Sequence, residues 1–458
     1  MTQHLPSDGL LTVKALQAAA SRREIHTVLV VFPDIYGRLL GKRLTAQFFL
    51  DHTAEGGMHV CDYLLACDME MDPVPGYRFT SWEKGYGDMH AVPDLCTLRK
   101  IEWLPGTALV LCDLFTPSHA PAFPAPRNIL KTQLSKAREM GFTVMGGTEL
   151  EFYVFNETYQ SARDKGYRGL VTAASYIEDY QILQGTREDG LLSSIRNGLS
   201  RSGVPVEGTK GEWGPGQQEL NLLYCEALEQ ADRAVICKHA AKEIAELQGK
   251  AVTFMAKWDE KLAGSGMHLH VSLLNAQNKS EFGEASPSGS DTFRWFLAGL
   301  IEHTAELTTL FAPYVSSYKR FQSGSFAPTG IAWSDDNRTA GYRVVGHGPS
   351  LRIECRIPGA DANPYLTYAA VLAAGLDGIA AKREPPAKFE GDIYQAEQLP
   401  RLHGNLRDAR DAFGGSKWVR SVFGDDVVDH YVHFMRTEQR KFDEVVTDWE
   451  KARFFERI

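Results

Sequence analysis

The feature that most constrains this chain is a set of short segments in which polar and apolar residues alternate strictly. In "GTELEFYVF", Glu149 and Glu151 share one side, and in "GMHLHVSL" the residues His268, His270 and Ser272 share one side. The residues between them are almost all apolar. Successive side chains of a β-strand point to opposite faces, so each segment predicts a half-buried strand. The sequence therefore predicts a sheet with one apolar face and one face rich in acids and histidine.

Two further segments extend this polar face. "LRIECRI" places Arg352, Glu354 and Arg356 on one side, and "GEWGPGQQEL" carries Glu212 and Glu219 around a Gly/Pro turn. A solvated sheet face explains each segment singly. Together the segments supply five carboxylates and a histidine, a set that suits Mg²⁺ or Mn²⁺. A zinc site would need three or four Cys/His ligands, which are not offered.

Arginines are concentrated near the last of these strands. Arg320, Arg338, Arg343, Arg352 and Arg356 fall within 37 residues. Guanidinium groups bind phosphates and carboxylates bidentately, and metal ions with arginines are the components of phosphoryl-transfer sites. The chain has no G-x-x-x-x-G-K-[ST] loop and no G-x-G-x-x-G after a predicted strand, so ATP would have to be held in another way.

Composition restricts the class of protein. The 458 residues are 43% hydrophobic and 23% charged, which is ordinary for a soluble globular protein of two or three domains. The formal net charge of -9 and the lack of a Lys/Arg run argue against nucleic-acid binding. No run of 18 apolar residues and no secretory leader is recognised, so no membrane contact is expected. Seven cysteines without a C-x-x-C pair favour a reduced, cytoplasmic protein.

The domain boundary is predicted from proline. Four prolines lie within 116–127 and disfavour regular structure there, which gives domains 1–115 and 116–458. Helical patterns occupy 127–141, 226–249, 363–381 and the segment from Asp425 onward, between short strands. The predicted class is α+β, with a small N-terminal domain and a large second one.

The motifs occur in an order that resembles the glutamine synthetase family. The blocks are "TELEF", "GE…PGQQE", "FMAKW…GSGMHLHVS", "SYKRFQSGSFAPT", "DNRTAGYR" and "LRIECRIPGADANPYL". The resemblance implies an N-terminal β-grasp domain and a catalytic domain with an antiparallel, barrel-like sheet and helices. It also implies a homo-oligomer, usually two stacked hexameric rings with active sites between subunits. ATP would phosphorylate glutamate, and an amine would then attack the γ-glutamyl phosphate.

Matching motifs imply a role for each residue. Two or more divalent ions would be held by six ligands, in the sets Glu151, Glu212, Glu219 and Glu149, His268, Glu354. Nucleotide contacts would come from Glu207, Tyr224, His270, Ser272, Arg343 and Arg352. Glutamate and its phosphoryl oxygens would be bound by Arg320, Arg356 and the backbone of Gly264, and Arg338 would stabilise the transferring phosphoryl group.

Departures from the family pattern indicate the acceptor. Phe326 stands where ammonia-using members carry a flap glutamate, and Trp213 stands beside Glu212 where a small residue is common. Ammonium in an apolar pocket is costly, so these residues favour an amine that carries carbon. Tyr176 is expected in the same pocket. Asp62, from a neighbouring subunit, is expected to deprotonate the amine.

The resulting hypothesis is a γ-glutamylamide synthetase of amine catabolism or nitrogen assimilation, closest in appearance to γ-glutamylethanolamide synthetases. Its acceptor would be a compact monoamine of the ethanolamine, isopropylamine or aniline type. The alternatives are a polyamine-using synthetase, an ammonia-using glutamine synthetase and an inactive structural member. A polyamine pocket would need a distal acid, for which Asp62, Asp68 and Glu70 are candidates. Tyr394, near a position that some bacterial members adenylylate, is expected to be a surface tyrosine.

Overall fold

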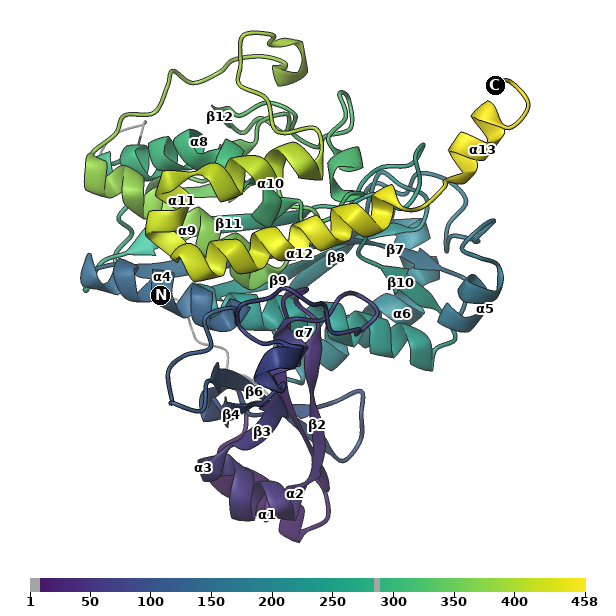
Figure 1. The fold of residues 1–458 in the computed structure, drawn as a ribbon, viewed down its shortest axis with the longest axis vertical. Helices are drawn as coiled ribbons and strands as arrows, with labels where there is room; N and C mark the ends of the chain where they lie inside the picture. The colour runs from purple at the N-terminus through teal and green to yellow at the C-terminus, as the bar shows by residue number, and fades with distance from the viewer. Residues whose placement is uncertain (1–8, 284–288) are drawn as a thin grey trace.

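Two separate β-sheets organise the chain in the computed structural model, which describes residues 9–283 and 289–458 (Figure 1). The N-terminal sheet has the strand order β2-β1-β6-β4-β3, with β5 paired to β6. Its strands are β1 (Thr27–Pro33), β2 (Leu39–Thr45), β3 (Met58–Cys61), β4 (Asp88–Pro93), β5 (Arg99–Ile101) and β6 (Thr107–Phe115). β1 pairs in parallel with β6 and antiparallel with β2. Short helices α1 (Val13–Ser21), α2 (Ala46–Phe48) and α3 (Ala54–Gly56) complete this part.

The larger sheet carries the predicted polar face. Its order is β12-β13-β14-β11-β7-β9-β8, with β10 paired to β7. The strands are β7 (Thr143–Phe155), β8 (Val206–Gly211), β9 (Gln217–Glu226), β10 (Ala251–Thr253), β11 (Met267–Leu274), β12 (Trp333–Asp335), β13 (Tyr342–Val345) and β14 (Arg352–Cys355). The pairs are antiparallel as expected, except that β12 and β13 run parallel.

Strand register brings the polar residues together. Glu149 on β7 lies opposite His268 on β11 and opposite Asn221 on β9, and Glu151 lies opposite Glu219. The alternate side chains of the same strands form the core, where Leu150, Phe152 and Leu269 are completely buried. Because side chains alternate with a period of two, one face of the sheet packs in the core and the other carries the acids and the histidine.

Helices cover the apolar side of this sheet and its ends (Figure 1). They are α4 (Pro126–Glu139), α5 (Tyr159–Asp164), α6 (Ile182–Ser200), α7 (Ala227–Leu247), α8 (Asp291–Phe311), α9 (Pro364–Ala381), α10 (Leu406–Gly415), α11 (Lys417–Phe423), α12 (Asp425–Asp443) and α13 (Asp448–Phe454). The helices predicted over 127–141, 226–249 and 363–381 are confirmed as α4, α7 and α9. In the described part of the chain, α9 is long and apolar enough to cross a membrane, but 78% of it is buried in the core.

A buried ion network joins the two sheets. Arg127, at the start of α4, contacts Asp94 and Asp113 of the N-terminal part and Asp232 of α7, with N–O distances between 2.5 and 3.0 Å. Later in the chain, the Tyr431 hydroxyl of α12 donates to the carbonyl of Pro124 at 2.9 Å. The α+β class is confirmed. The division at 115/116 stays a prediction, and it falls in the segment between β6 and α4.

Candidate active site

The centre of the polar face is a compact group of carboxylates around His268. Ligand atoms of Glu149, His268 and Glu354 lie within 4.8 Å of one another, and so do those of Glu151, Glu219 and His268. His268 belongs to both groups, with Nδ1 3.1 Å from Glu149 Oε2 and Nε2 3.6 Å from Glu151 Oε1. Five of the six predicted metal ligands are therefore brought together by β7, β9, β11 and β14.

The carboxylates of this group perturb one another's ionisation. Burial, reinforced by the negative charge of Glu149, raises the pKa of Glu219 to about 9. Burial opposes ionisation of Glu149 as well, but hydrogen bonds with His268 and His270 outweigh it and hold the pKa of Glu149 well below its usual range. Several carboxylate oxygens and one imidazole in a largely buried space form a donor set that fits hard divalent cations such as Mg²⁺ or Mn²⁺.

Glu212 is a member of neither group, and its role as a metal ligand stays a prediction. It pairs with Lys210, whose Nζ contacts Glu212 Oε1 and lies 3.9 Å from Glu219 Oε2. Burial opposes ionisation of Glu212, but the charge of Lys210 lowers its pKa. Lys210 was not among the predicted site residues, because a lysine on a polar strand face is typical of a solvated surface.

The turn that joins Glu212 to Glu219 is fixed by a second missed residue. Glu178 is completely buried, and its carboxylate accepts hydrogen bonds from Gly216 N at 3.1 Å and from Gln218 Nε2 at 2.7 Å. Burial raises the pKa of Glu178. The residue lies in an irregular segment before α6, where no pattern in the sequence distinguishes it from a solvated acid.

Glycines let Arg320 approach the carboxylate group. A Cβ at Gly264 would lie 2.7 Å from Arg320 Cγ, and one at Gly266 would lie 2.7 Å from Arg320 Nη2. The Gly266 amide also donates to Glu151 Oε2 at 2.6 Å. Arg320 is buried and donates to the carbonyls of Ile357 at 2.9 Å and Arg356 at 3.1 Å. A larger residue at Gly264 or Gly266 would clash with Arg320, which explains the small residues before His268.

The other predicted arginines differ in their surroundings. Arg356 Nη1 donates to Glu354 Oε1 at 2.6 Å, and Arg343 Nη1 donates to Glu354 Oε2 at 3.0 Å. The Nε of Arg356 is buried and has no hydrogen-bond partner among the described residues. Arg338 lies exposed in a turn before β13 and forms no ion pair within the described ranges.

The predicted nucleotide residues follow one strip of the sheet. A Cβ at Gly147 would lie 3.3 Å from His270 Cβ and 3.7 Å from Tyr224 Cβ, so these two side chains flank Gly147. Arg352 Nε donates to His270 Nδ1 at 3.2 Å, and Ser272 is the next residue on that face of β11. Glu207 lies exposed at an irregularity of β8, where no described contact joins it to the strip.

Two aromatic residues adjoin residues of the site: Trp213 follows Glu212 directly, and the carbonyl of Phe326 accepts a hydrogen bond from Arg356 Nη2 at 3.5 Å. The rings of Trp213 and Phe326 meet edge to face, with centroids 5.9 Å apart, and each residue is about half exposed at 49% and 48%. Phe326 has φ +57°, a conformation that bulky residues rarely adopt. Tyr394 is half-buried rather than a free surface tyrosine, and its hydroxyl donates to the carbonyl of Ala327 at 2.9 Å, which ties down the segment that carries Phe326.

The candidate acids of the N-terminal part have partners other than Trp213 and Phe326 within one chain. Asp62 begins a short 3-10 turn after β3 and accepts a hydrogen bond from Thr80 Oγ1 at 2.6 Å. Asp68 and Glu70 both pair with Lys441, at 2.5 and 2.9 Å. Tyr176 is exposed and lies in the irregular segment before α6. None of these side chains has a described contact with the carboxylate group.

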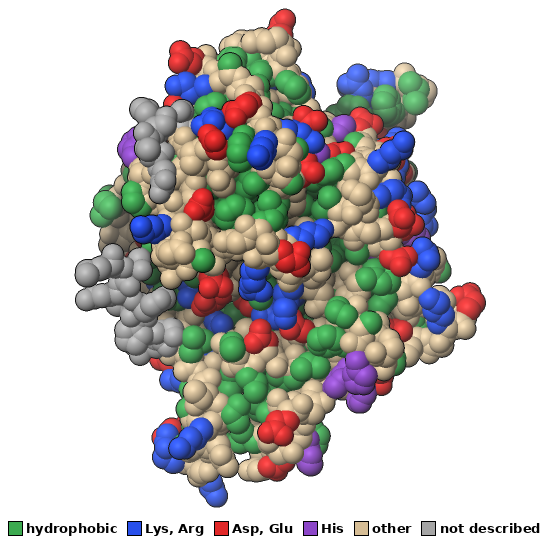
Figure 2. All heavy atoms as spheres, turned by 90° about the vertical axis from the view of Figure 1, so that its left-hand side faces the viewer, with side chains coloured by type: hydrophobic (Ala, Val, Ile, Leu, Met, Phe, Trp, Pro, Cys, Tyr) green, Lys and Arg blue, Asp and Glu red, His purple; other side chains and the backbone are tan. Residues whose placement is uncertain are grey.

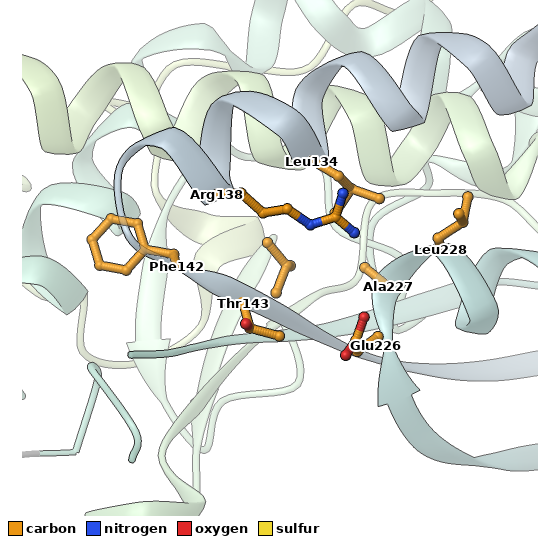
Figure 3. Close-up of a pocket in the computed structure, with 8 residues that line it drawn as sticks. Leu134, Arg138, Phe142, Thr143, Glu226, Ala227 and Leu228 are labelled. Atoms are coloured by element: carbon orange, nitrogen blue, oxygen red, sulfur yellow. The ribbon is translucent and has the colours of Figure 1, made fainter. Parts of the chain in front are cut away.

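A separate cavity lies between α4, the start of β7 and the start of α7 (Figure 3). Its volume is about 250 Å³, and Arg138 and Glu226 supply its charged lining. No predicted site residue lines it. On the molecular face drawn in Figure 2, acidic and basic side chains are interspersed, without a continuous basic stripe.

The comparison with known proteins defines the class. Residues 124–454 match the model of the glutamine synthetase catalytic domain, and the chain belongs to the glutamine synthetase family. Among its relatives, the gamma-glutamylethanolamide synthetase GlnA4 of Streptomyces coelicolor is 46% identical over 448 residues, 98% of this chain and 96% of that one. A glutamate–isopropylamine ligase of a Pseudomonas species is 34% identical over 442 residues, 95% and 96% of the two chains. The solved structure of GmaS with ADP superposes with a TM-score of 0.84 at 27% identity, covering 96% of this chain and 99% of that one.

Proposed function

We propose that this protein is an ATP-dependent ligase that joins the γ-carboxyl group of L-glutamate to a compact primary monoamine, with release of ADP and phosphate. The observation that carries the proposal is the edge-to-face wall of Trp213 and Phe326 beside a carboxylate group suited to divalent cations. The similarity to an ethanolamide synthetase and an isopropylamine ligase supports the same acceptor class.

In this proposal, six side chains would hold Mg²⁺ or Mn²⁺: Glu149, Glu151, Glu212, Glu219, His268 and Glu354. Bound divalent ions would neutralise charge on the phosphates of ATP. The nucleotide is bound by Tyr224, His270, Ser272, Arg343 and Arg352, together with Glu207. The unpaired Nε of Arg356 supports its role in binding glutamate, together with Arg320 and Gly264.

Arg338 has no ion-pair partner within the described residues, so its guanidinium is free to spread charge over the phosphoryl oxygens during transfer. The resulting γ-glutamyl phosphate is attacked by a neutral amine, whose substituent lies against Phe326, Trp213 and Tyr176. Burying each methylene there contributes about 0.8 kcal/mol. A base must remove the amine proton, and Asp62 is proposed as this base. Within its own chain Asp62 accepts a hydrogen bond from Thr80 and has no described contact with the site, so the Asp62 that acts would belong to a neighbouring subunit.

The proposed assembly is a homo-oligomer of two stacked hexameric rings in the cytoplasm. Support comes from the C-terminal end, where α13 projects from the body of the subunit (Figure 1). Exposed apolar side chains are concentrated there: Val445, Val446, Trp449, Phe454, Phe455 and Ile458. A contiguous exposed apolar segment favours contact with another copy of the chain.

The alternatives predict different acceptors. An ammonia-using enzyme would need polar or anionic partners where Phe326 and Trp213 stand. An inactive member would not require a preserved ligand group at Glu149, His268 and Glu354. A polyamine-using enzyme would need a distal acid, and the two acids Asp68 and Glu70 are already paired with Lys441.

The test is phosphate release from ATP and glutamate with ammonia, ethanolamine, isopropylamine, aniline, putrescine or spermidine, with each product identified by mass spectrometry. We expect a γ-glutamylamide with a compact monoamine and poor use of ammonia and spermidine. Preference for ammonia would overturn the proposed acceptor, and absence of phosphate release with every amine would overturn the proposed activity.

A further inference from the structure

The short turn that holds Tyr394 is hydrogen-bonded to the segment that carries Phe326. Tyr394 belongs to the 3-10 turn Ile393–Gln395, and its hydroxyl donates to the carbonyl of Ala327 at 2.9 Å. Burial raises the pKa of Tyr394, so the hydroxyl keeps its proton and remains a donor at neutral pH. Because Ala327 follows Phe326 directly, this bond restrains the backbone one residue beyond the aromatic ring.

The turn is itself anchored, so the Tyr394 hydroxyl is held at a fixed position. Ile393 is completely buried and packs in a small apolar cluster with Ala332 and Ala340. The amide of Ile393 also donates to Thr339 Oγ1 at 3.2 Å. These contacts do not involve the hydroxyl of Tyr394, so its loss should leave the turn in place.

The backbone after Phe326 is restrained at successive peptide groups. Arg356 Nη2 donates to the carbonyl of Phe326 at 3.5 Å, and the Tyr394 hydroxyl holds the next carbonyl. Pro328 follows, and it disfavours the helical conformation for Ala327. Phe326 has φ +57°, and such a conformation of a bulky residue persists only where its surroundings determine it. Of the two side chains that hold these carbonyls, the tyrosine has no part in the proposed chemistry.

We propose that Tyr394 is a positioning residue: its hydroxyl helps to hold Phe326 against Trp213 and so maintains the preference for an alkylated amine over ammonia. This inference rests on the proposed function, because it requires the two rings to form part of the acceptor pocket. The edge-to-face contact of the rings depends on where the backbone places Phe326. Without the hydroxyl, Phe326 is freer to relax to negative φ, which moves its ring away from Trp213.

The test compares the ratio of kcat/KM for ethanolamine to kcat/KM for ammonia in the wild type and in Tyr394→Phe, which removes only the hydroxyl. One neutral hydrogen bond shifts a conformational equilibrium by about two- to twelvefold, and we expect the ratio to fall within this range. Tyr159→Phe is the matched control, because the Tyr159 hydroxyl also donates to a carbonyl, that of Val252, at 3.0 Å, and neither residue is assigned to the site. Its ratio should equal that of the wild type.

A double-mutant cycle with Phe326→Gly shows whether the effect passes through the ring. Tyr394→Phe should lower the ratio in the wild-type background and leave it unchanged in Phe326→Gly, because the ring that the hydroxyl holds is absent there. If Tyr394 acts on the substrates or on Arg356 instead, the same fall appears in both backgrounds. That result would overturn the inference.

Hydrogen exchange of the peptide that covers 321–331 measures the restraint without any substrate. We expect its amides to exchange about two- to twelvefold faster in Tyr394→Phe than in the wild type and in Tyr159→Phe. Unchanged exchange, or an unchanged ratio in Tyr394→Phe, overturns the inference. A wild type that prefers ammonia overturns the proposed function instead, and the exchange result then still decides whether Tyr394 holds the segment.

Discussion

Replacement of Phe326 by glycine separates backbone strain from substrate selectivity. Phe326 has φ +57°, which costs an L-residue about 1–2 kcal/mol and costs glycine almost nothing. Against this gain stand the edge-to-face contact with Trp213, about 0.5–1.5 kcal/mol, and the extra chain entropy of glycine, about 0.5–1 kcal/mol. Apart from the burial of the ring itself, these terms cancel to within about 1.5 kcal/mol. We therefore expect Phe326→Gly to lower the thermal midpoint only by what burial of the half-exposed ring contributes.

Phe48→Gly is the matched control for this variant. Phe48 is exposed to a similar degree, at 51%, but it has helical backbone angles, φ -62° and ψ -38°. Glycine there relieves no strain and loses helix propensity worth about 0.8–1 kcal/mol in addition to the contacts of the ring. Phe48→Gly should therefore unfold at a lower temperature than Phe326→Gly in scanning calorimetry at one scan rate. Equal destabilisation by the two variants would refute the strain argument.

The preference for amines with longer carbon substituents should depend on Phe326 and not on Phe48. With the ring of Phe326 present, each added methylene in methylamine, ethylamine and propylamine should raise kcat/KM by up to about fourfold, the equivalent of about 0.8 kcal/mol. In Phe326→Gly this increment should become much smaller, and Phe48→Gly should retain it. Steady-state phosphate release measures the three values for each protein. An increment that is absent in the wild type, or that is the same in Phe326→Gly, would refute the role of the ring.

Further predictions concern the ligand group, the arginines and a buried histidine. Glu149→Ala and His268→Ala should lower turnover at least about a thousandfold with an unchanged circular dichroism spectrum, since metal ions supply several kcal/mol to the transition state; a large residual turnover with Mg²⁺ or Mn²⁺ would contradict the assignment. Arg338→Lys should mainly lower kcat, and Arg320→Lys should mainly raise the KM for glutamate, because lysine lacks the guanidinium geometry; equal effects on both parameters at both positions would show that the roles are not separate. Burial lowers the pKa of His430 to about 3, so below pH 6.5 the unfolded chain binds a proton that the folded chain does not. Between pH 7.5 and 5.5 this should cost the folded state about 1.4 kcal/mol, and His430→Gln should remove that part of the pH dependence of the thermal midpoint; parallel curves for the two proteins would contradict it.

The positions of the ligands could be predicted because strand geometry is regular. The period of two places Glu149 and Glu151 on one face, and the same period on β11 places His268 there. Antiparallel pairing then aligns the two strands. Strand periodicity did not predict that Glu212, directly after the end of β8, would pair with Lys210.

The residues that sequence reasoning missed depend on tertiary contacts. Lysine on a polar strand face is typical of a solvated surface, so the enclosure of Lys210 by Glu212 and Tyr180 has no local signature. Glu178 becomes significant only because the chain folds its irregular segment against the turn at Gly216. The positive φ of Phe326 is equally invisible in the sequence, since bulky residues rarely adopt that conformation.

The aromatic pair of Phe326 and Trp213 is proposed to select an alkylated amine over ammonia. A single reaction with ATP, glutamate, ¹⁵N-ammonia and ethanolamine at equal concentrations of free base measures this most directly, because the ratio of the two products gives the ratio of the specificity constants. We predict that mass spectrometry finds the γ-glutamyl ethanolamide in large excess over ¹⁵N-glutamine, and that the excess shrinks in Phe326→Glu. An excess of ¹⁵N-glutamine from the wild-type protein would contradict the account.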